Sequence, residues 1–243
     1  MRNSKSLLKM ITLSMLIALG VVISPILRVE GMCPMAHFIN IICSVFLGPW
    51  YSLLCATLIG VIRMMLMGIP PIALTGAVFG AFLSGVFYRM SKGRIIFAVL
   101  GEILGTGVIG AIMSYPVMTF LWGKEGLSWL FYVPSFICGT LIGGSIAYVF
   151  LRKFASNGML ARIQTMLGSE SYLDQTSILS NTLTIAAFGA ILFVVIELAS
   201  NIFKLSGVVW DKLSYASLIV CAAAAVLYYI TKKVKVSHAA GNP

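Results

Sequence analysis

The sequence predicts an all-α protein, a polytopic bundle of membrane-spanning helices. Three observations lead to this prediction: 60% of the 243 residues are hydrophobic, only 10% are charged, and the mean hydropathy is +1.02. A hydrocarbon core of about 30 Å requires roughly 20 apolar residues per helix. The chain supplies such runs repeatedly, and nearly all of its charges lie between them. A soluble domain of this length could not bury so much apolar surface.

The apolar runs predict eight spans. The second run is short for a full crossing, so we expect it to be tilted or covered at its outer end by the preceding loop. Gly48-Pro49-Trp50 separates this run from the next one. Pro49 fits the first turn of the following helix, where proline is tolerated. The predicted spans are residues 7–27, 35–47, 49–67, 72–90, 95–121, 129–151, 179–202 and 213–231.

Basic residues gather at one end of these spans. Twelve of the 17 Lys and Arg residues fall before the first span, between the fourth and fifth, after the sixth, or after the last. The positive-inside rule therefore predicts a multi-pass protein of the cell membrane with both termini in the cytoplasm. The net charge of +10 is then a signal of topology. Nucleic-acid binding would require one basic surface with interleaved aromatic residues.

The chain is predicted to divide into three parts. Residues 1–153 form a membrane domain of six spans with short loops. Residues 154–178 are more polar and carry apolar residues at helical spacing from Leu160 to Leu167, which predicts a cytoplasmic helix at the membrane surface. Residues 179–243 are predicted to form a transmembrane hairpin with a basic tail.

No motif of an enzyme is present in the sequence. It contains no phosphate-binding loop, no His-Glu-x-x-His and no Gly-x-Ser-x-Gly. The five cysteines show no paired spacing, and one of the two histidines, His238, lies in the polar tail. We therefore expect no catalytic residues, no metal site, no disulfide and no cofactor.

Polar residues that suit ligand binding lie toward the predicted outer face. His37 and Asn40 are spaced i, i+3 and share one face of the second span. A ring nitrogen and an amide suit a neutral heteroaromatic ligand, although both residues could equally contact water or backbone. Arg63 lies about one turn before the third span ends. It either caps a ligand pocket, pairs with a carboxylate, or extends to the outer headgroups.

Glu102 is the most deeply placed acidic residue of the six-span domain. It lies eight residues past Arg94, which is about 12 Å into the membrane. Gly101, Gly105 and Thr106 beside it allow a neighbouring helix to approach and supply a polar group. A carboxyl at that depth is protonated or bonded to donors. Glu102 and Thr106 are therefore predicted either to contact a ligand or to join helices.

Aromatic residues border the next predicted outer loop. Tyr115 precedes Pro116, which leaves a backbone carbonyl available to a ligand or a side chain. Trp122, Trp129 and Tyr132 either form an aromatic belt at the interface or line a pocket that stacks an aromatic ring. Tyr115 and Tyr132 are the candidate ligand contacts of this group.

The first span has a face of small residues. Ser14 and Ala18 form a small-xxx-small pair, which is typical of close contact between membrane helices. The pair predicts that a partner helix packs there, from this chain or from another.

Several segments, taken in order, resemble the ThiW family. The family comprises membrane S components of energy-coupling-factor (ECF) transporters, assigned to uptake of the thiamine precursor hydroxyethylthiazole. The resemblance covers about residues 7–152. The matching segments are Ile17–Pro25, Pro34, His37–Asn40, Leu47–Tyr51, Arg63, Leu74–Ala81, Gly101–Gly107 and Tyr115-Pro116.

The resemblance implies six helices with the ligand bound near the outer face. It also implies docking to a transmembrane coupling subunit and to two ATPases, which would use the ATP. Ser14 and Ala18 match the position of the family's Ala-xxx-Ala contact with the coupling subunit, with serine replacing the first alanine. The extension after Arg152 departs from the usual six-helix S component.

The expected function is therefore capture of neutral hydroxyethylthiazole, hydrogen-bonded by His37, Asn40 and Glu102. Two alternatives remain. In the first, the chain is a proton-coupled secondary transporter in which Glu102 carries the proton and Arg63 binds an anion. In the second, it is a membrane scaffold that docks through its C-terminal extension.

Overall fold

The computed structural model describes residues 2–26, 28, 32–172, 178–179, 181–186, 189–190, 193, 196 and 208–240. The chain divides into two compact units, Met1–Asp174 and Gln175–Pro243. Each unit is described by itself below.

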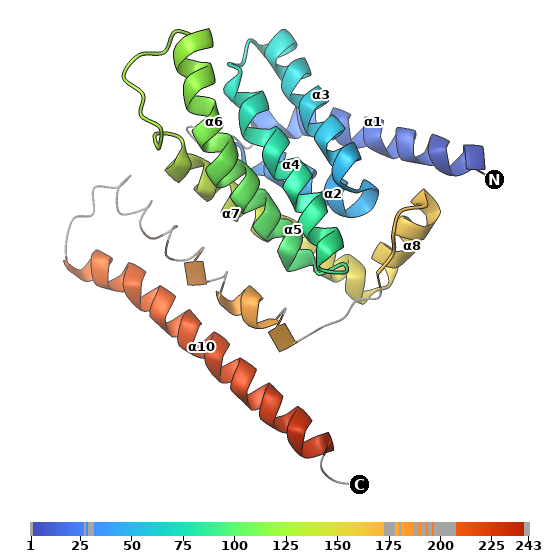
Figure 1. Cartoon of the computed structure of the whole chain (residues 1–243), viewed down its shortest axis with the longest axis vertical. Helices are drawn as coiled ribbons and strands as arrows, with labels where there is room; N and C mark the ends of the chain where they lie inside the picture. The colour runs from blue at the N-terminus through green and yellow to red at the C-terminus, as the bar shows by residue number, and fades with distance from the viewer. Residues whose placement is uncertain are drawn as a thin grey trace. The chain divides into compact units, whose positions relative to one another are not determined.

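The first unit is a bundle of helices joined by short loops (Figure 1). Two π-helical segments, η1 (Ile103–Gly110) and η2 (Val117–Leu121), join their neighbours into one continuous helical stretch from Ile95 to Leu121. The remaining elements are α1 (Arg2–Ile26), α2 (Pro34–Leu47), α3 (Pro49–Met67), α4 (Ile72–Met90), α5 (Ile95–Glu102), α6 (Ala111–Pro116), α7 (Val133–Ser156) and α8 (Met159–Leu167). These helices follow the predicted spans closely. The largest differences are that α1 begins at Arg2 and that α7 begins at Val133 and ends at Ser156.

Six helices among the described residues are long and apolar enough to cross a membrane. Many of their large apolar side chains are exposed on the bundle surface, for example Met15, Met65 and Val149. Such side chains suit contact with lipid, and together with the all-helical architecture they confirm the predicted polytopic bundle. The six helices are Ser4–Ile26, Pro49–Met67, Ile72–Met90, Ile95–Leu121, Val133–Ser156 and Lys212–Val234.

The short helix α2 lies in the middle of the first unit. It packs against α1, α3, α4, α5, α7 and α8, and 11 of its 14 residues are buried. A helix of 14 residues is only about 21 Å long. Because its neighbours surround it, its polar side chains face protein rather than lipid. This explains how a short span can carry several polar residues.

Helix α4 packs closely on α5 and η1 through glycines. A Cβ at Gly101 would lie 2.5 Å from the backbone oxygen of Leu83, and one at Gly105 would lie 2.5 Å from Cα of Gly80. No side chain fits at these distances, so the two backbones touch directly. This contact brings the start of η1 against the middle of α4.

Helix α8 closes one end of the first unit. Its buried residues are Leu160, Gln164 and Leu167, and it packs on α1, α2 and α7. Lys5 of α1 lies beside Gly168 at the C-terminal end of α8. The beginning of α1 and α8 are therefore at the same end of the bundle (Figure 1).

The second unit contains α10 (Val208–Ala240), a helix of 33 residues that includes the predicted span 213–231. Most of the predicted span 179–202 lies outside the described residues, and its described residues are helical. Within this unit, Asn181 Nδ2 donates to Tyr228 Oη at 2.8 Å. Gly189 lies against Cys221, since a Cβ at Gly189 would collide with the cysteine side chain. These contacts place the two segments side by side.

Candidate functional site

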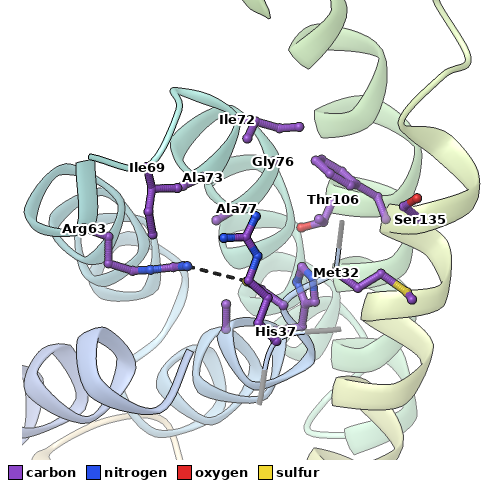
Figure 2. A pocket seen from close by; sticks show the side chains of 14 residues that line it. Met32, His37, Arg63, Ile69, Ile72, Ala73, Gly76, Ala77, Thr106 and Ser135 are labelled. Atoms are coloured by element: carbon purple, nitrogen blue, oxygen red, sulfur yellow. Dashed lines mark hydrogen bonds between the residues drawn. The ribbon is translucent and has the colours of Figure 1, made fainter. Parts of the chain in front are cut away.

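A cavity lies at the end of the first unit opposite α8. The beginnings of α2, α4 and α7 and the end of α3 meet there (Figure 2). Its volume is about 80 Å³, whereas a water molecule needs at least about 10–15 Å³. It therefore has room for a small molecule. The lining residues are Arg28, Met32, Cys33, Ala36, His37, Arg63, Ile69, Ile72, Ala73, Gly76, Ala77, Thr106, Ser135 and Phe136.

A hydrogen-bonded network centred on Glu102 lies beneath this cavity. Glu102 Oε1 accepts from Asn40 Nδ2 at 3.0 Å and from Thr106 Oγ1 at 3.1 Å. It also lies 2.9 Å from His37 Nδ1. Asn40, Thr106 and Glu102 are almost fully buried, and Glu102 has no exposed surface. His37 and Thr106 belong both to this network and to the cavity wall, so they connect the two.

The donors of the network fix the chemistry at His37. Glu102 Oε1 already accepts from Asn40 and Thr106, and it also accepts from His37 in the tautomer that carries its proton on Nδ1. In the neutral ring this leaves Nε2 as an acceptor. None of the described residues donates to that nitrogen. A ligand hydroxyl or N–H group can therefore bond to it.

Glu102 keeps one oxygen without a partner. Three donors converge on Oε1, whereas Oε2 is buried and has none among the described residues. A buried carboxylate oxygen without a hydrogen bond is costly. Such a group in a native fold is typical of a functional site rather than of a contact that only joins helices.

Gly80 of α4 provides the space for this carboxyl. A Cβ at Gly80 would lie 2.8 Å from Glu102 Cδ and would also collide with the hydroxyl of Thr106. Glu102 is the last residue of α5, and Thr106 lies in the π-helical segment η1. Segments of this kind are frequent at functional sites. The close approach of α4 and η1 thus shapes the network.

Two arginines line the cavity. Arg63 reaches it from α3 and is only 3% exposed. Its Nη2 lies 3.5 Å from Cys33 Sγ, and its buried Nε has no partner. Figure 2 shows Arg63 extending from its helix toward the centre of the cavity. Arg28 also lines the cavity and is exposed.

The structure brings five of the seven predicted binding residues together. His37, Asn40, Glu102 and Thr106 form the network, and Arg63 lines the same cavity. Whether these side chains contact a ligand stays a prediction. It follows from the geometry that a molecule in the cavity would touch His37, Thr106 and Arg63 directly.

The two predicted tyrosines do not line the cavity. Tyr115 packs on Trp129, with ring centroids 4.5 Å apart. Tyr132 lies behind Phe136, with centroids 5.9 Å apart, and burial raises the pKa of its phenol. The aromatic ring that lines the cavity is Phe136.

Sequence reasoning missed Phe136 and the glycines of α4. Gly76 and Gly80 are spaced i, i+4 and face the Gly101–Gly110 stretch. That spacing is a signal of close helix contact and could have identified this interface. Phe136 gives no such signal, because it lies in a run of apolar residues like many others.

Comparison with known protein families decides the family. Residues 10–157 match the family described as thiamine-precursor transporter protein (ThiW). The chain belongs to the ThiW family. It is a membrane transport protein of that family and not an enzyme, which confirms the resemblance found in the sequence. The match includes the cavity and the Glu102 network and ends before α8. Neither a curated protein nor a solved structure matched the chain.

Proposed function

We propose that this ThiW-family protein is the substrate-capture subunit of an ECF-type importer. It binds the neutral thiamine precursor hydroxyethylthiazole at the outer face of the cell membrane. A transmembrane coupling subunit and two ATPases then drive uptake with ATP. The chain itself needs no cofactor, in keeping with the absence of a phosphate-binding loop from the sequence.

The observation that carries the proposal is the cavity above the Glu102 network. Small-molecule sites are mostly apolar, with a few convergent polar groups that orient the ligand. Here Phe136 and several aliphatic residues form the walls, while His37 and Thr106 supply the polar groups. The hydroxyl of the ligand donates to Nε2 of His37, and the thiazole ring packs on Phe136.

The distribution of charge supports an outward-facing cavity. The N-terminal lysines, the loop after α4 and the residues following α7 lie at the end of the bundle that α8 closes. Most basic residues of the first unit are at this end, which the positive-inside rule assigns to the cytoplasm. The cavity is at the opposite end and therefore opens to the exterior, with both termini of the chain in the cytoplasm.

The first helix offers a surface for the coupling subunit. Ser14 and Ala18 are exposed on α1, next to exposed apolar residues such as Met15. Small side chains allow another helix to approach closely. The double variant Ser14→Leu/Ala18→Leu should therefore lose co-purification with the partner subunits and keep its ligand affinity.

Equilibrium binding to the purified protein in detergent tests the proposal. We expect hydroxyethylthiazole to bind without a pH gradient, and Asn40→Ala and Glu102→Gln to weaken binding by about tenfold or more. Thr57→Ala is a control, since Thr57 bonds only to the backbone of its own helix at Leu53. Absence of binding for hydroxyethylthiazole, thiamine and hydroxymethylpyrimidine alike would refute the proposal.

The unpartnered oxygen of Glu102 favours one alternative, a proton-coupled secondary transporter. Buried carboxyls and histidines form proton relays in membrane transporters. This alternative requires uptake by the chain alone in proteoliposomes, abolished when the pH gradient is collapsed. The capture subunit requires the partner subunits and ATP, so the same assay separates the two functions.

A further inference from the structure

Arg63 has an unusual environment for a buried cation. It is 97% buried, yet none of the described residues places a carboxylate within ion-pair distance of it. Among the described residues, its one hydrogen bond goes to the thiol of Cys33 at 3.5 Å, and a thiol is a weak acceptor. None of them bonds to its Nε. Buried charges in proteins are normally paired, because an unpaired one costs several kcal/mol.

Neither of the ordinary explanations for such an arginine fits. An arginine that reaches the headgroups or water keeps its guanidinium exposed, whereas Arg63 is almost fully covered. An arginine that only holds helices together bonds to backbone carbonyls or carboxylates. The partner of Arg63 among the described residues is the sulfur atom of Cys33.

The charges around the cavity are unbalanced. Arg63 and Arg28 both line it, and none of its lining residues is acidic. Glu102 lies beneath the wall, and its Oε1 is already shared by His37, Asn40 and Thr106. Its other oxygen, Oε2, lies against Gly80 of α4, since a Cβ at Gly80 would be 2.8 Å from it. Within the part of the chain that the structure describes, the cavity therefore presents two cations and no anion.

We infer that the cavity prefers a thiazole that carries an anionic group, a phosphate or a carboxylate, over the neutral alcohol, because the anion binds to Arg63. This inference rests on the proposed function and specifies the substrate class for the same cavity. The heteroaromatic ring lies against Phe136 and His37, and the anion lies between Arg63 and the exposed Arg28. A guanidinium presents a planar fork of N–H donors that matches both phosphate and carboxylate. The anion then accepts a hydrogen bond from the free Nε and pairs with the positive charge of Arg63.

Comparison of charged and neutral ligands tests this inference directly. The probes are hydroxyethylthiazole, its phosphate ester, and the thiazole acid in which a carboxylate replaces the hydroxymethyl end. Calorimetry on the purified protein should give an affinity about 10–100-fold higher for one or both anions than for the neutral alcohol. The ester and the acid separate phosphate from carboxylate. Inorganic phosphate should compete with the preferred anion only weakly, since it lacks the ring.

Variants of Arg63 provide the second part of the test. Arg63→Gln should bring the affinities for the anion and the alcohol to within about threefold of each other. Arg63→Lys should give an intermediate preference, because it keeps the charge and loses the fork. Arg89→Gln removes the same charge at the opposite end of the bundle and should leave the preference unchanged. Thermal melting confirms that each variant folds, and the wild-type comparison stands without any variant.

The failures of the two proposals are distinguishable. If the neutral alcohol binds to the wild type as tightly as both anions, the inference is wrong and the capture function stands. The inference is equally wrong if Arg63→Gln keeps the preference for the anion. If no thiazole binds, the proposed function fails and the inference fails with it.

Discussion

The two ends of α2 are built differently. At its beginning, His37 and Asn40 converge on Glu102, and a cavity with two arginines lies above them. Toward its end, Ser44 bonds to Ser84 at 2.7 Å, and Gln164 of α8 covers this region. Both ends carry buried polar groups in the middle of a membrane bundle.

The difference lies in what satisfies those groups. Toward its end, the protein supplies the partner: Gln164 Nε2 donates to Val45 O at 2.9 Å and to Tyr88 Oη at 3.0 Å. At its beginning, Nε2 of His37 and Nε of Arg63 are left without one. Helix α8 thus supplies hydrogen bonds at one end of α2, although Gln164 Oε1 is buried without a partner among the described residues. At the other end, the residues with unpaired groups line a cavity that can hold a ligand. Each of the following predictions tests this contrast.

Glu102→Ala should have the largest effect. It leaves the donors of His37, Asn40 and Thr106 unpaired, so we expect the free energy of unfolding to fall by about 2–4 kcal/mol. Ligand affinity should fall by roughly 100-fold, because the groups that orient His37 are lost. Thermal melting and calorimetry in detergent measure the two effects. Unchanged affinity in a folded variant would show that the network does not serve binding.

Gly80→Ala should have the next largest effect. The added methyl group collides with Thr106 and Glu102, which we expect to cost about 1–3 kcal/mol of stability and tenfold or more in affinity. Gly144→Ala is the matched control, because its Cβ would lie 2.8 Å from Val99 Cγ1, an apolar neighbour outside the network. Equal losses of affinity in both variants would contradict a specific role for the space at Gly80.

Gln164→Ala should lower stability and leave binding intact. The change removes two buried hydrogen bonds and leaves a cavity, which costs about 1–3 kcal/mol. Ligand affinity should stay within about twofold of the wild type, since α8 is at the far end of α2. A large loss of affinity in a variant that is folded to the same extent as the wild type would mean that the two ends of α2 are coupled.

Ser44→Ala should have the smallest effect. It removes the hydroxyl–hydroxyl contact with Ser84 and a bond to the backbone oxygen of Ile41, so the expected loss of stability is about 0.5–1.5 kcal/mol. Affinity should not change measurably. The comparison with Asn40→Ala, one turn earlier on the same face of α2, places the limit of the binding region along the helix.

Much of the fold follows from the sequence, because in lipid each span has to form its backbone hydrogen bonds within itself, as a helix. The boundaries of α3 and α4 were predicted to the residue. At α7 the apolar run begins at Trp129, and the helix begins only at Val133, with Pro134 in its first turn. Aromatic residues continue the apolar pattern into the loop, so composition alone cannot locate that boundary.

The site could be predicted in part. His37 and Asn40 share a helix face, and Glu102 lies deep in a span, so each stands out locally as a polar residue that needs partners. Their meeting depends on how α2, α4 and η1 pack across more than 60 residues of sequence. That packing depends on backbone contacts at Gly80 and Gly105. The glycine spacing within each helix indicates close contact with a neighbour but does not say which helix that neighbour is. For the same reason the sequence did not distinguish Phe136 from Tyr132.

The central claim is that the cavity at the beginning of α2 holds the ligand. A structure of the purified protein with saturating hydroxyethylthiazole, or its anionic counterpart, tests it most directly. We predict ring density between Phe136 and His37 for either ligand, and for the anionic one a charged group beside Arg63. Ligand density in a different cavity of the first unit, such as the one between Tyr88, Leu160 and Tyr172, with the cavity above Glu102 empty, would contradict the account.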